Sequence, residues 1–296
     1  MNKSGNVNFG GAFREKSFSE FFKNLKTVNS KLKVMAAIGK GSLASMDFLI
    51  EPETSNGTWA KSILKFVEKY EIDGIEIQWR SWPKEETMHA LQIIQNIRKG
   101  LNQLAESKNR PEPYLLALAV SSSSWINRDF LKLDDLLETV DFINVANFSE
   151  RRFSRNYSRE PTMKSFACAT EKRDKINMDL EFYGKVWKNS TVTEDVFWTS
   201  RKIVSWREIK NSNESSWNEE LKSPYILNLT NLEYIGFENE RSLVEKMKYI
   251  EDNNFGGVTM TWLNYDDDQN TLLNAVTSVD LCSRGQFETR KIQCDE

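Results

Sequence analysis

The sequence predicts an α/β protein built around parallel strands, and three observations support this prediction. Short apolar runs, typical of buried strands, alternate six times with segments whose apolar residues recur at helical spacing. One segment, residues 190–238, interrupts the alternation. A glycine-rich first turn, which would indicate a doubly wound nucleotide-binding sheet, is absent from the sequence. The pattern therefore favours a barrel of alternating strands and helices.

The expected elements follow one another along the whole chain. Buried strands are expected at 32–38, 72–79, 114–120, 141–146, 176–183 and 257–263. Helices are expected over 18–28, 57–70, 84–106, 130–138, 163–170, 241–250 and 271–279. A further strand at 225–229 lies inside the interrupting segment.

Composition excludes several functional classes. The chain has 296 residues, enough for one large domain, with 39% hydrophobic and 28% charged residues. The formal net charge of −3 predicts no nucleic-acid or membrane partner, and no apolar run is long enough to span a bilayer. The single histidine, His89, is expected to be a packing or surface residue. No metal site or cofactor motif can be assembled, and a Ser-His-Asp hydrolase is nearly excluded.

The three cysteines and the sequons bear on the cellular compartment. Cys282 and Cys294 could pair near the C-terminus, free thiols being an equal alternative, and the polar tail from Cys282 is expected to be loosely held. The N-terminus has no apolar core of a signal peptide. Sequons that hint at secretory ancestry include those of Asn56, Asn156, Asn189, Asn213 and Asn228.

The strand at 72–79 has one apolar and one polar face. Its apolar residues are Ile75, Ile77 and Trp79, and its polar row is Glu76, Gln78 and Arg80. Helices are expected on both sides of this strand in the sequence, so the strand is expected to be parallel and buried on both faces. In a βα-barrel the polar row would point into the barrel, where uncompensated polar groups cost several kcal/mol. This row is therefore a functional site or the remains of one.

DGIEIQWR at 73–80 resembles the signature DGxDxDWE that glycoside hydrolase family 18, the chitinases, carries on its fourth barrel strand. Similar family segments are LKVMAAIGKGS at 32–42, DFINVANFS at 141–149, INMDLEFYGKVW at 176–187, FENERSLVEKMKYI at 237–250 and FGGVTMTWLNYDDD at 255–268. The resemblance covers roughly residues 30–280. It is strongest to the degenerate chitinase-like proteins of nematodes, which also end in a DDD…LLNAV…LCS pattern.

The resemblance implies a single family-18-like (β/α)8 TIM barrel domain over 1–296, with a small α+β subdomain inserted at about 190–238. It starts just before the third strand of the family, so the first two strands are expected to be missing. The chain is then expected to be a fragment with unpaired strand edges and marginal stability. The missing segment would have carried any signal peptide, since the family is secreted.

The same resemblance implies that every reacting acid is lost. Arg80 stands at the position of the catalytic Glu and Gln78 at that of the assisting Asp, while Phe148 and Ser149 replace a Tyr and an Asp. The family reaction needs a protonated carboxyl group as acid, which a guanidinium cannot replace at neutral pH. The sequence therefore predicts no catalytic residue and no chitin hydrolysis.

Binding and structural roles can still be assigned by resemblance. The candidate substrate-binding residues are Trp262, Tyr183, Trp79 and Arg80. Core packing is the alternative for each aromatic residue, and a tolerated change in a dead site is the alternative for Arg80. Structural roles inside the barrel are expected for Asp73, Gly74 and Glu76.

Three functions remain open from the sequence. The first is an inactive chitinase-like protein that binds chitin or chito-oligosaccharides, which aromatic residues at the barrel mouth would favour. The second is a scaffold or interaction protein without sugar binding, which a mouth filled by Arg80 and the arginine-rich loop 151–159 would favour. The third is an active glycosidase that uses other residues, for which the sequence offers no candidate carboxyl group.

Overall fold

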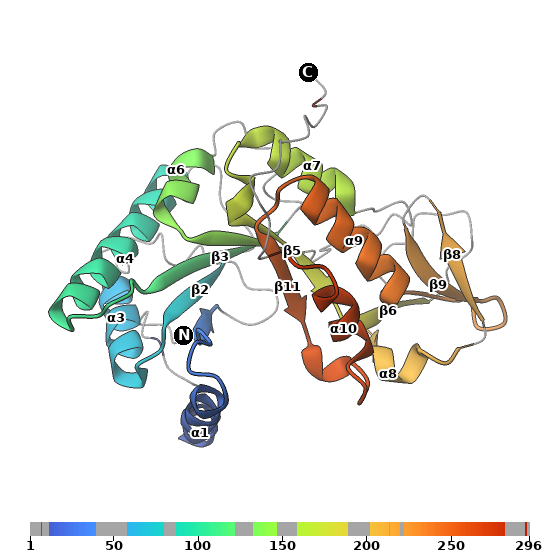
Figure 1. Ribbon diagram of the computed structural model, residues 1–296, viewed down its shortest axis with the longest axis horizontal. Coiled ribbons are helices and arrows are strands. Elements are labelled where there is room, and N and C mark those ends of the chain that lie inside the picture. Colours follow the sequence, from blue (N-terminus) through green and yellow to red (C-terminus); the bar gives the residue numbers. More distant parts are fainter. Residues whose placement is uncertain are drawn as a thin grey trace. The chain divides into compact units, whose positions relative to one another are not determined.

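The computed structural model describes residues 7, 12–39, 58–79, 87–121, 133–146, 159–188, 202–212, 214–219, 222–281 and 294. The chain forms two compact parts, residues 1–143 and 144–296. Each part is an α/β assembly in which helices alternate with parallel strands (Figure 1). Among the helices of the described residues, none is both long and apolar enough to cross a membrane.

The first part contains three neighbouring parallel strands, β1, β2 and β3, and begins β4. Its elements are α1 (Ala12–Val28), β1 (Met35–Ile38), α3 (Thr58–Tyr70), β2 (Gly74–Trp79), α4 (Thr87–Ser107), β3 (Leu115–Ser121), α6 (Leu133–Thr139) and β4 (Phe142–Ala146). β2 lies between β1 and β3 and pairs in parallel with both. These elements confirm the alternation expected from the sequence.

The apolar face of β2 forms the core of this part. Ile75 and Ile77 are fully buried, as are Ile63 and Val67 of α3 and Ile94 of α4. Figure 1 shows α3 and α4 together beside the strands. Helical spacing of apolar residues gives each helix one apolar face, which is buried against the sheet. The expectation that the apolar face of this strand is buried is thus confirmed for Ile75 and Ile77.

The second part combines two parallel strands with an antiparallel sheet. Its elements are α7 (Arg159–Ala169), η4 (Arg173–Lys175), β5 (Ile176–Glu181), β6 (Tyr183–Lys188), β7 (Lys202–Ser205), α8 (Trp206–Ile209), β8 (Ser215–Asn218), β9 (Ser223–Asn228), β10 (Glu233–Gly236), α9 (Glu240–Asp252), β11 (Gly257–Thr261), η5 (Leu263–Tyr265) and α10 (Thr271–Thr277). β5 and β11 pair in parallel. The chain thus has the expected fold class, an incomplete (β/α)8 barrel with an α+β insertion, and the insertion lies in the second part.

The antiparallel sheet has the strand order β7-β6-β10-β9-β8, and short α8 lies beside it (Figure 1). Gly184 of β6 marks the closest packing in this sheet. A Cβ atom at Gly184 would lie 2.9 Å from Ile235 and 3.0 Å from Ile209 of α8. A larger residue at this position would therefore require the side chains of Ile235 and Ile209 to shift. β9 includes residues 225–228 of the strand expected at 225–229, and Leu229 lies in the turn that follows.

The fifth parallel strand is shorter than the sequence predicts. It was expected to run through Tyr183, but β5 ends at Glu181 and Tyr183 begins the antiparallel strand β6. Buried Phe182 joins the two sheets, because its N–H donates to Thr261 of β11 and its carbonyl accepts from Trp206. An apolar run cannot reveal such a change of partner, since both strands have the same period.

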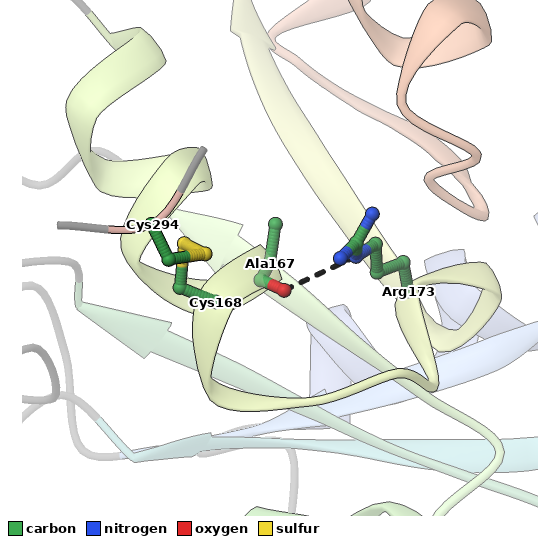
Figure 2. The surroundings of a disulfide bond; sticks show 4 residues. All are labelled: Ala167, Cys168, Arg173 and Cys294. Atoms are coloured by element: carbon green, nitrogen blue, oxygen red, sulfur yellow. Dashed lines mark hydrogen bonds between the residues drawn. A yellow bond between two sulfur atoms is a disulfide. The ribbon is translucent and has the colours of Figure 1, made fainter. Parts of the chain in front are cut away.

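A disulfide bond fixes the C-terminal end of the chain to α7. Cys294 is bonded to Cys168, with the two Cα atoms 5.7 Å apart (Figure 2). The expected alternatives, a Cys282–Cys294 bond or free thiols, are therefore wrong for Cys294, and Cys282 lies outside the described residues. Beside the disulfide, the buried Arg173 side chain donates to the carbonyl of Ala167 at 3.1 Å, which satisfies one of the last carbonyl groups of α7. At least this residue of the polar tail is thus held by a covalent bond.

Candidate functional site

Three aromatic side chains gather where the parallel strands of the second part end. Trp262 directly follows β11, and Tyr183 lies just beyond the end of β5. The Trp262 ring lies 5.8 Å from the Tyr183 ring and 4.7 Å from the Tyr265 ring, which meets it edge-on. Trp262 is 47% exposed, whereas Tyr183 is buried. The structure therefore brings two of the candidate binding residues together and leaves an indole surface accessible.

The backbone of Trp262 has an uncommon conformation. Its φ of 66° and ψ of 54° place it in the left-handed region, which bulky residues rarely adopt. Its carbonyl accepts a 2.8 Å hydrogen bond from the N–H of Tyr265, which closes the short helix η5. Such a conformation costs about 1–3 kcal/mol and occurs often at binding sites. The orientation of this tryptophan is thus imposed by its surroundings.

Glu181 is a site residue that sequence reasoning did not identify as such. It is the last residue of β5, is 5% exposed, and accepts hydrogen bonds from the Tyr183 hydroxyl at 2.7 Å and from Lys185 Nζ at 2.8 Å. The ammonium group of Lys185 also lies 5.7 Å from the centre of the Tyr183 ring. These contacts fix the phenol ring against which Trp262 packs. The only signal in the sequence is that Glu181 stands where the resembling family segment has a proline.

Further polar residues lie on the same face of β5. Because side chains alternate along a strand, Asn177, Asp179 and Glu181 share this face. Asp179 is buried and accepts a 2.5 Å hydrogen bond from the hydroxyl of Thr261. Asn177 donates to the side chain of Asn144 at 3.0 Å. This polar row stabilises the pairing of β5 with β11 and leads to the aromatic cluster.

The polar row of β2 belongs to the first part of the chain. Gln78 is half-buried, and its Nε2 lies 3.5 Å from Oε1 of Glu76. The register places Ala117 opposite Glu76 and Ala119 opposite Gln78. On the other side, a Cβ atom at Gly39 would lie 3.0 Å from Cβ of Gln78. Small neighbours on both strands therefore leave room for the two long polar side chains.

Asp73 lies just before β2 and connects three segments of the first part. Its buried carboxylate accepts hydrogen bonds from Lys26 Nζ at 2.6 Å, Arg110 Nη2 at 2.7 Å and the N–H of Val34 at 2.8 Å. Burial alone would raise the pKa of Asp73, but the hydrogen bonds from Lys26, Val34 and Arg110 outweigh it and hold this pKa below its usual value. Asp73 thus anchors α1, β1 and the approach to β3 as an ionised group.

Gly74 is required by the close approach of β2 and β3. A Cβ atom at this position would lie 2.3 Å from the carbonyl oxygen of Leu115. No side chain fits such a gap, so any substitution must separate the paired strands.

A polar groove on α4 and α6 is a separate feature of the first part. It encloses about 630 Å³ and is lined by polar and charged residues that include Arg98, Lys99 and Asp135. The Arg98 guanidinium already binds Asp141 at 2.6 Å and two backbone carbonyls. No aromatic residue lines this groove, so it lacks the platform on which a sugar ring stacks.

Comparison with known proteins assigns the chain to a family. The model of the glycosyl hydrolases family 18 matches residues 1–267. The chain belongs to this family. The match begins at residue 1, whereas the resemblance of the individual sequence segments begins at about residue 30. The expected family assignment is therefore confirmed.

Relatives within family 18 are distant in sequence and similar in fold. The chain is 22% identical to mouse chitotriosidase-1 over 293 residues, which cover 85% of this chain and 62% of that protein. The structure has a TM-score of 0.78 to human YKL-39, described as a pseudo-chitinase with retained chitooligosaccharide binding, at 18% identity over 93% of this chain and 87% of that one. For TsES1, an immunomodulatory active chitinase of Trichuris suis, the TM-score is 0.77 at 16% identity, over 90% and 82% of the two chains. The chain thus spans about three fifths of the length of the mouse relative.

Several family-18 positions of interest lie outside the described residues. These are Arg80, Phe148, Ser149 and the arginines at 151, 152 and 155. The same holds for the side chain of Trp79, whose backbone ends β2. Within the described ranges, no three side chains of His, Cys, Asp or Glu gather as metal ligands. The candidate site that the structure describes therefore consists of Trp262, Tyr183, Tyr265, Glu181 and Lys185.

Proposed function

We propose that this family-18 chain is catalytically inactive and binds chitin or chito-oligosaccharides. The half-exposed indole of Trp262, held by the rings of Tyr183 and Tyr265, is the observation that carries the proposal. An indole face stacks on the apolar face of a pyranose ring and needs no catalytic acid to do so. Human YKL-39, which has a similar fold, is a pseudo-chitinase with retained chitooligosaccharide binding. This likeness supports the combination of inactivity and sugar binding.

The proposed inactivity rests on the chemistry of the replaced residues. Substrate-assisted cleavage needs a carboxylic acid that donates a proton to the glycosidic oxygen. Neither Arg80 nor Gln78 can replace this acid. Phe148 has no hydroxyl group to hold the N-acetyl group, and Ser149 carries no charge. In the second part, buried Glu181 accepts hydrogen bonds from an ammonium and a phenol group, as expected of a positioning residue.

We also propose that the protein matures in the secretory pathway and belongs with the degenerate chitinase-like proteins of nematodes. Disulfide bonds persist in oxidising compartments, and Cys168 and Cys294 form one. The sequons and the DDD…LLNAV…LCS pattern agree with this assignment.

Two parallel assays test the proposed function. Calorimetric titration with N-acetylchitotetraose should show binding, whereas cellotetraose, which lacks the acetamido groups, should bind much more weakly. A fluorogenic chitotriose substrate should show no turnover above blank. Absence of binding would favour the interaction-protein alternative. Turnover that is lost when a residue of this chain is changed would contradict the proposed inactivity.

A further inference from the structure

The turn between β9 and β10 is an exposed apolar tip of the antiparallel sheet. Asn228 and Glu233 form the last pair of the two strands, and all four residues between them are exposed. Two of these are leucines, Leu229 at 67% and Leu232 at 40% exposure. Leu232 also has a φ of 51°, which is uncommon for this residue type. The tip therefore presents the apolar side chains of Leu229 and Leu232 to solvent.

Asn228 stands at the base of this tip and begins the sequon Asn228-Leu229-Thr230. Its Oδ1 accepts hydrogen bonds from the N–H groups of Thr230 and Asn231, both at 3.0 Å. The amide oxygen is thus engaged by the turn, and the amide nitrogen, Nδ2, is the other polar atom of the side chain. The side chain is half-exposed, so a group attached to Nδ2 can extend into solvent without displacing the core.

We propose that Asn228 is N-glycosylated and that the first sugars of this glycan cover Leu229 and Leu232. The donor would be an oligosaccharide carried on a polyprenyl diphosphate in the secretory pathway. Nδ2 attacks C1 of the first N-acetylglucosamine, the C1–O bond to the diphosphate breaks, and the amide loses one proton as the N–C1 bond forms. The polyprenyl diphosphate is the leaving group, and no oxidant or reductant is needed. This inference rests on the secretory location proposed above.

The surroundings of Asn228 suit such a modification. Glu233 of β10 forms an ion pair with Lys188 of the neighbouring strand β6, at 3.5 Å. The four residues of the tip, 229–232, carry no charge. Apolar side chains at this level of exposure favour association with other surfaces. A glycan has apolar ring faces toward the protein and hydroxyl groups toward water, so it can cover the leucines and keep the tip soluble. A modification at this position therefore accounts for both the sequon and the exposed leucines.

Secreted expression of the full chain in insect cells, behind a heterologous signal peptide, tests the site directly. Peptide N-glycosidase treatment in heavy-oxygen water should convert Asn228 into a labelled aspartate, identified by mass spectrometry of the tryptic peptide. Variants N228Q and T230A should each lose the mass of one glycan. The matched variants N231Q, just outside the sequon, and T230S, which preserves it, should keep that glycan. An unlabelled residue 228 in the secreted chain overturns the proposal.

Removal of the glycan tests the covering of the leucines. The deglycosylated protein should bind more of a fluorescent apolar dye and self-associate more than the intact one. The double variant L229S/L232S should abolish this increase, because the apolar surface is then absent. Equal dye binding before and after deglycosylation would overturn the covering role. Chito-oligosaccharide affinity should be the same for N228Q and the parent, so failure of this inference is distinguishable from failure of the proposed function.

Discussion

The hydroxyl group of Tyr183 donates a 2.7 Å hydrogen bond to the carboxylate of Glu181. This bond connects the aromatic cluster to a buried ion pair, since Glu181 also accepts from Lys185 at 2.8 Å. The Tyr183 ring in turn packs against Trp262. The orientation of the exposed indole therefore depends on charged groups that face away from solvent.

Replacing Trp262 should weaken sugar binding. Trp262→Ala removes the stacking surface and should cost about 1–3 kcal/mol of chito-oligosaccharide binding free energy, as for an aromatic anchor. Isothermal titration measures this loss. Trp217→Ala on β8 is the matched control, because that ring stacks with Arg241 of α9 and its loss should leave affinity unchanged. Equal affinities of Trp262→Ala and the parent would remove the basis of the binding proposal.

The Glu181–Lys185 pair should contribute to stability only as a pair. Glu181→Gln leaves a buried ammonium group without its counter-charge and should lower the free energy of unfolding by about 3 kcal/mol. The double variant Glu181→Gln/Lys185→Met removes both charges and should recover most of this loss. Urea denaturation measures both values. A double variant no more stable than the single one would show that the ion pair does not determine the effect.

Restoring the catalytic acid alone should not restore catalysis. Arg80→Glu supplies a carboxyl group, but Gln78, Phe148 and Ser149 still differ from the reacting groups of the family. Catalytic groups act as a unit, so the single change should give no turnover of a fluorogenic chitobiose substrate. Measurable turnover by this variant would mean that fewer groups are needed than we infer.

Asp267 should make stability fall in acid. Burial alone would raise the pKa of Asp267, but hydrogen bonds from Lys210 and from the hydroxyl and N–H groups of Thr271 outweigh it and hold this pKa well below the usual value. A carboxyl group with a lowered pKa in the folded state stabilises the protein above its unfolded pKa of about 3.9, and this contribution is lost as the pH falls toward the folded value. Urea denaturation should show Asp267→Asn to be less stable than the parent at pH 7, with the difference shrinking progressively below about pH 4. A difference independent of pH would contradict the assignment.

The disulfide bond should stabilise the second part of the chain. It joins residues separated by 126 positions. Closing so long a loop lowers the conformational entropy of the unfolded chain, which can raise the free energy of unfolding by up to about 5 kcal/mol. The variant Cys168→Ser/Cys294→Ser should therefore have a lower Tm than the parent in a thermal scan. Cys282→Ser, which leaves this bond in place, should not change the Tm. A similar decrease for both variants would indicate that Cys282 takes part in the pairing.

Much of the fold could be predicted because it depends on local patterns. The six parallel strands and the main helices lie within a few residues of the expected ranges, since apolar periodicity records which face of an element is buried. The exceptions are the start of α1, six residues before the helix expected at 18–28, the end of β11 at Thr261, and the end of the fifth strand, where Phe182 joins two sheets. β5 and β6 have the same period in the sequence. Only the positions of Thr261 and Trp206 in space show where β5 ends and β6 begins.

The sequence by itself determined the family and the alternation of strands and helices, because both depend on residue identity and short spacing. It placed Trp262 inside the strand expected at 257–263, whereas β11 ends at Thr261 and Trp262 follows it. The tertiary structure alone decided that Cys294 pairs with Cys168, that Asp73 is held by Lys26 and Arg110, and that Glu181 binds Tyr183 and Lys185. Covalent and hydrogen bonds depend on distances of a few ångströms and on the direction in which each side chain points, and only the folded chain fixes both.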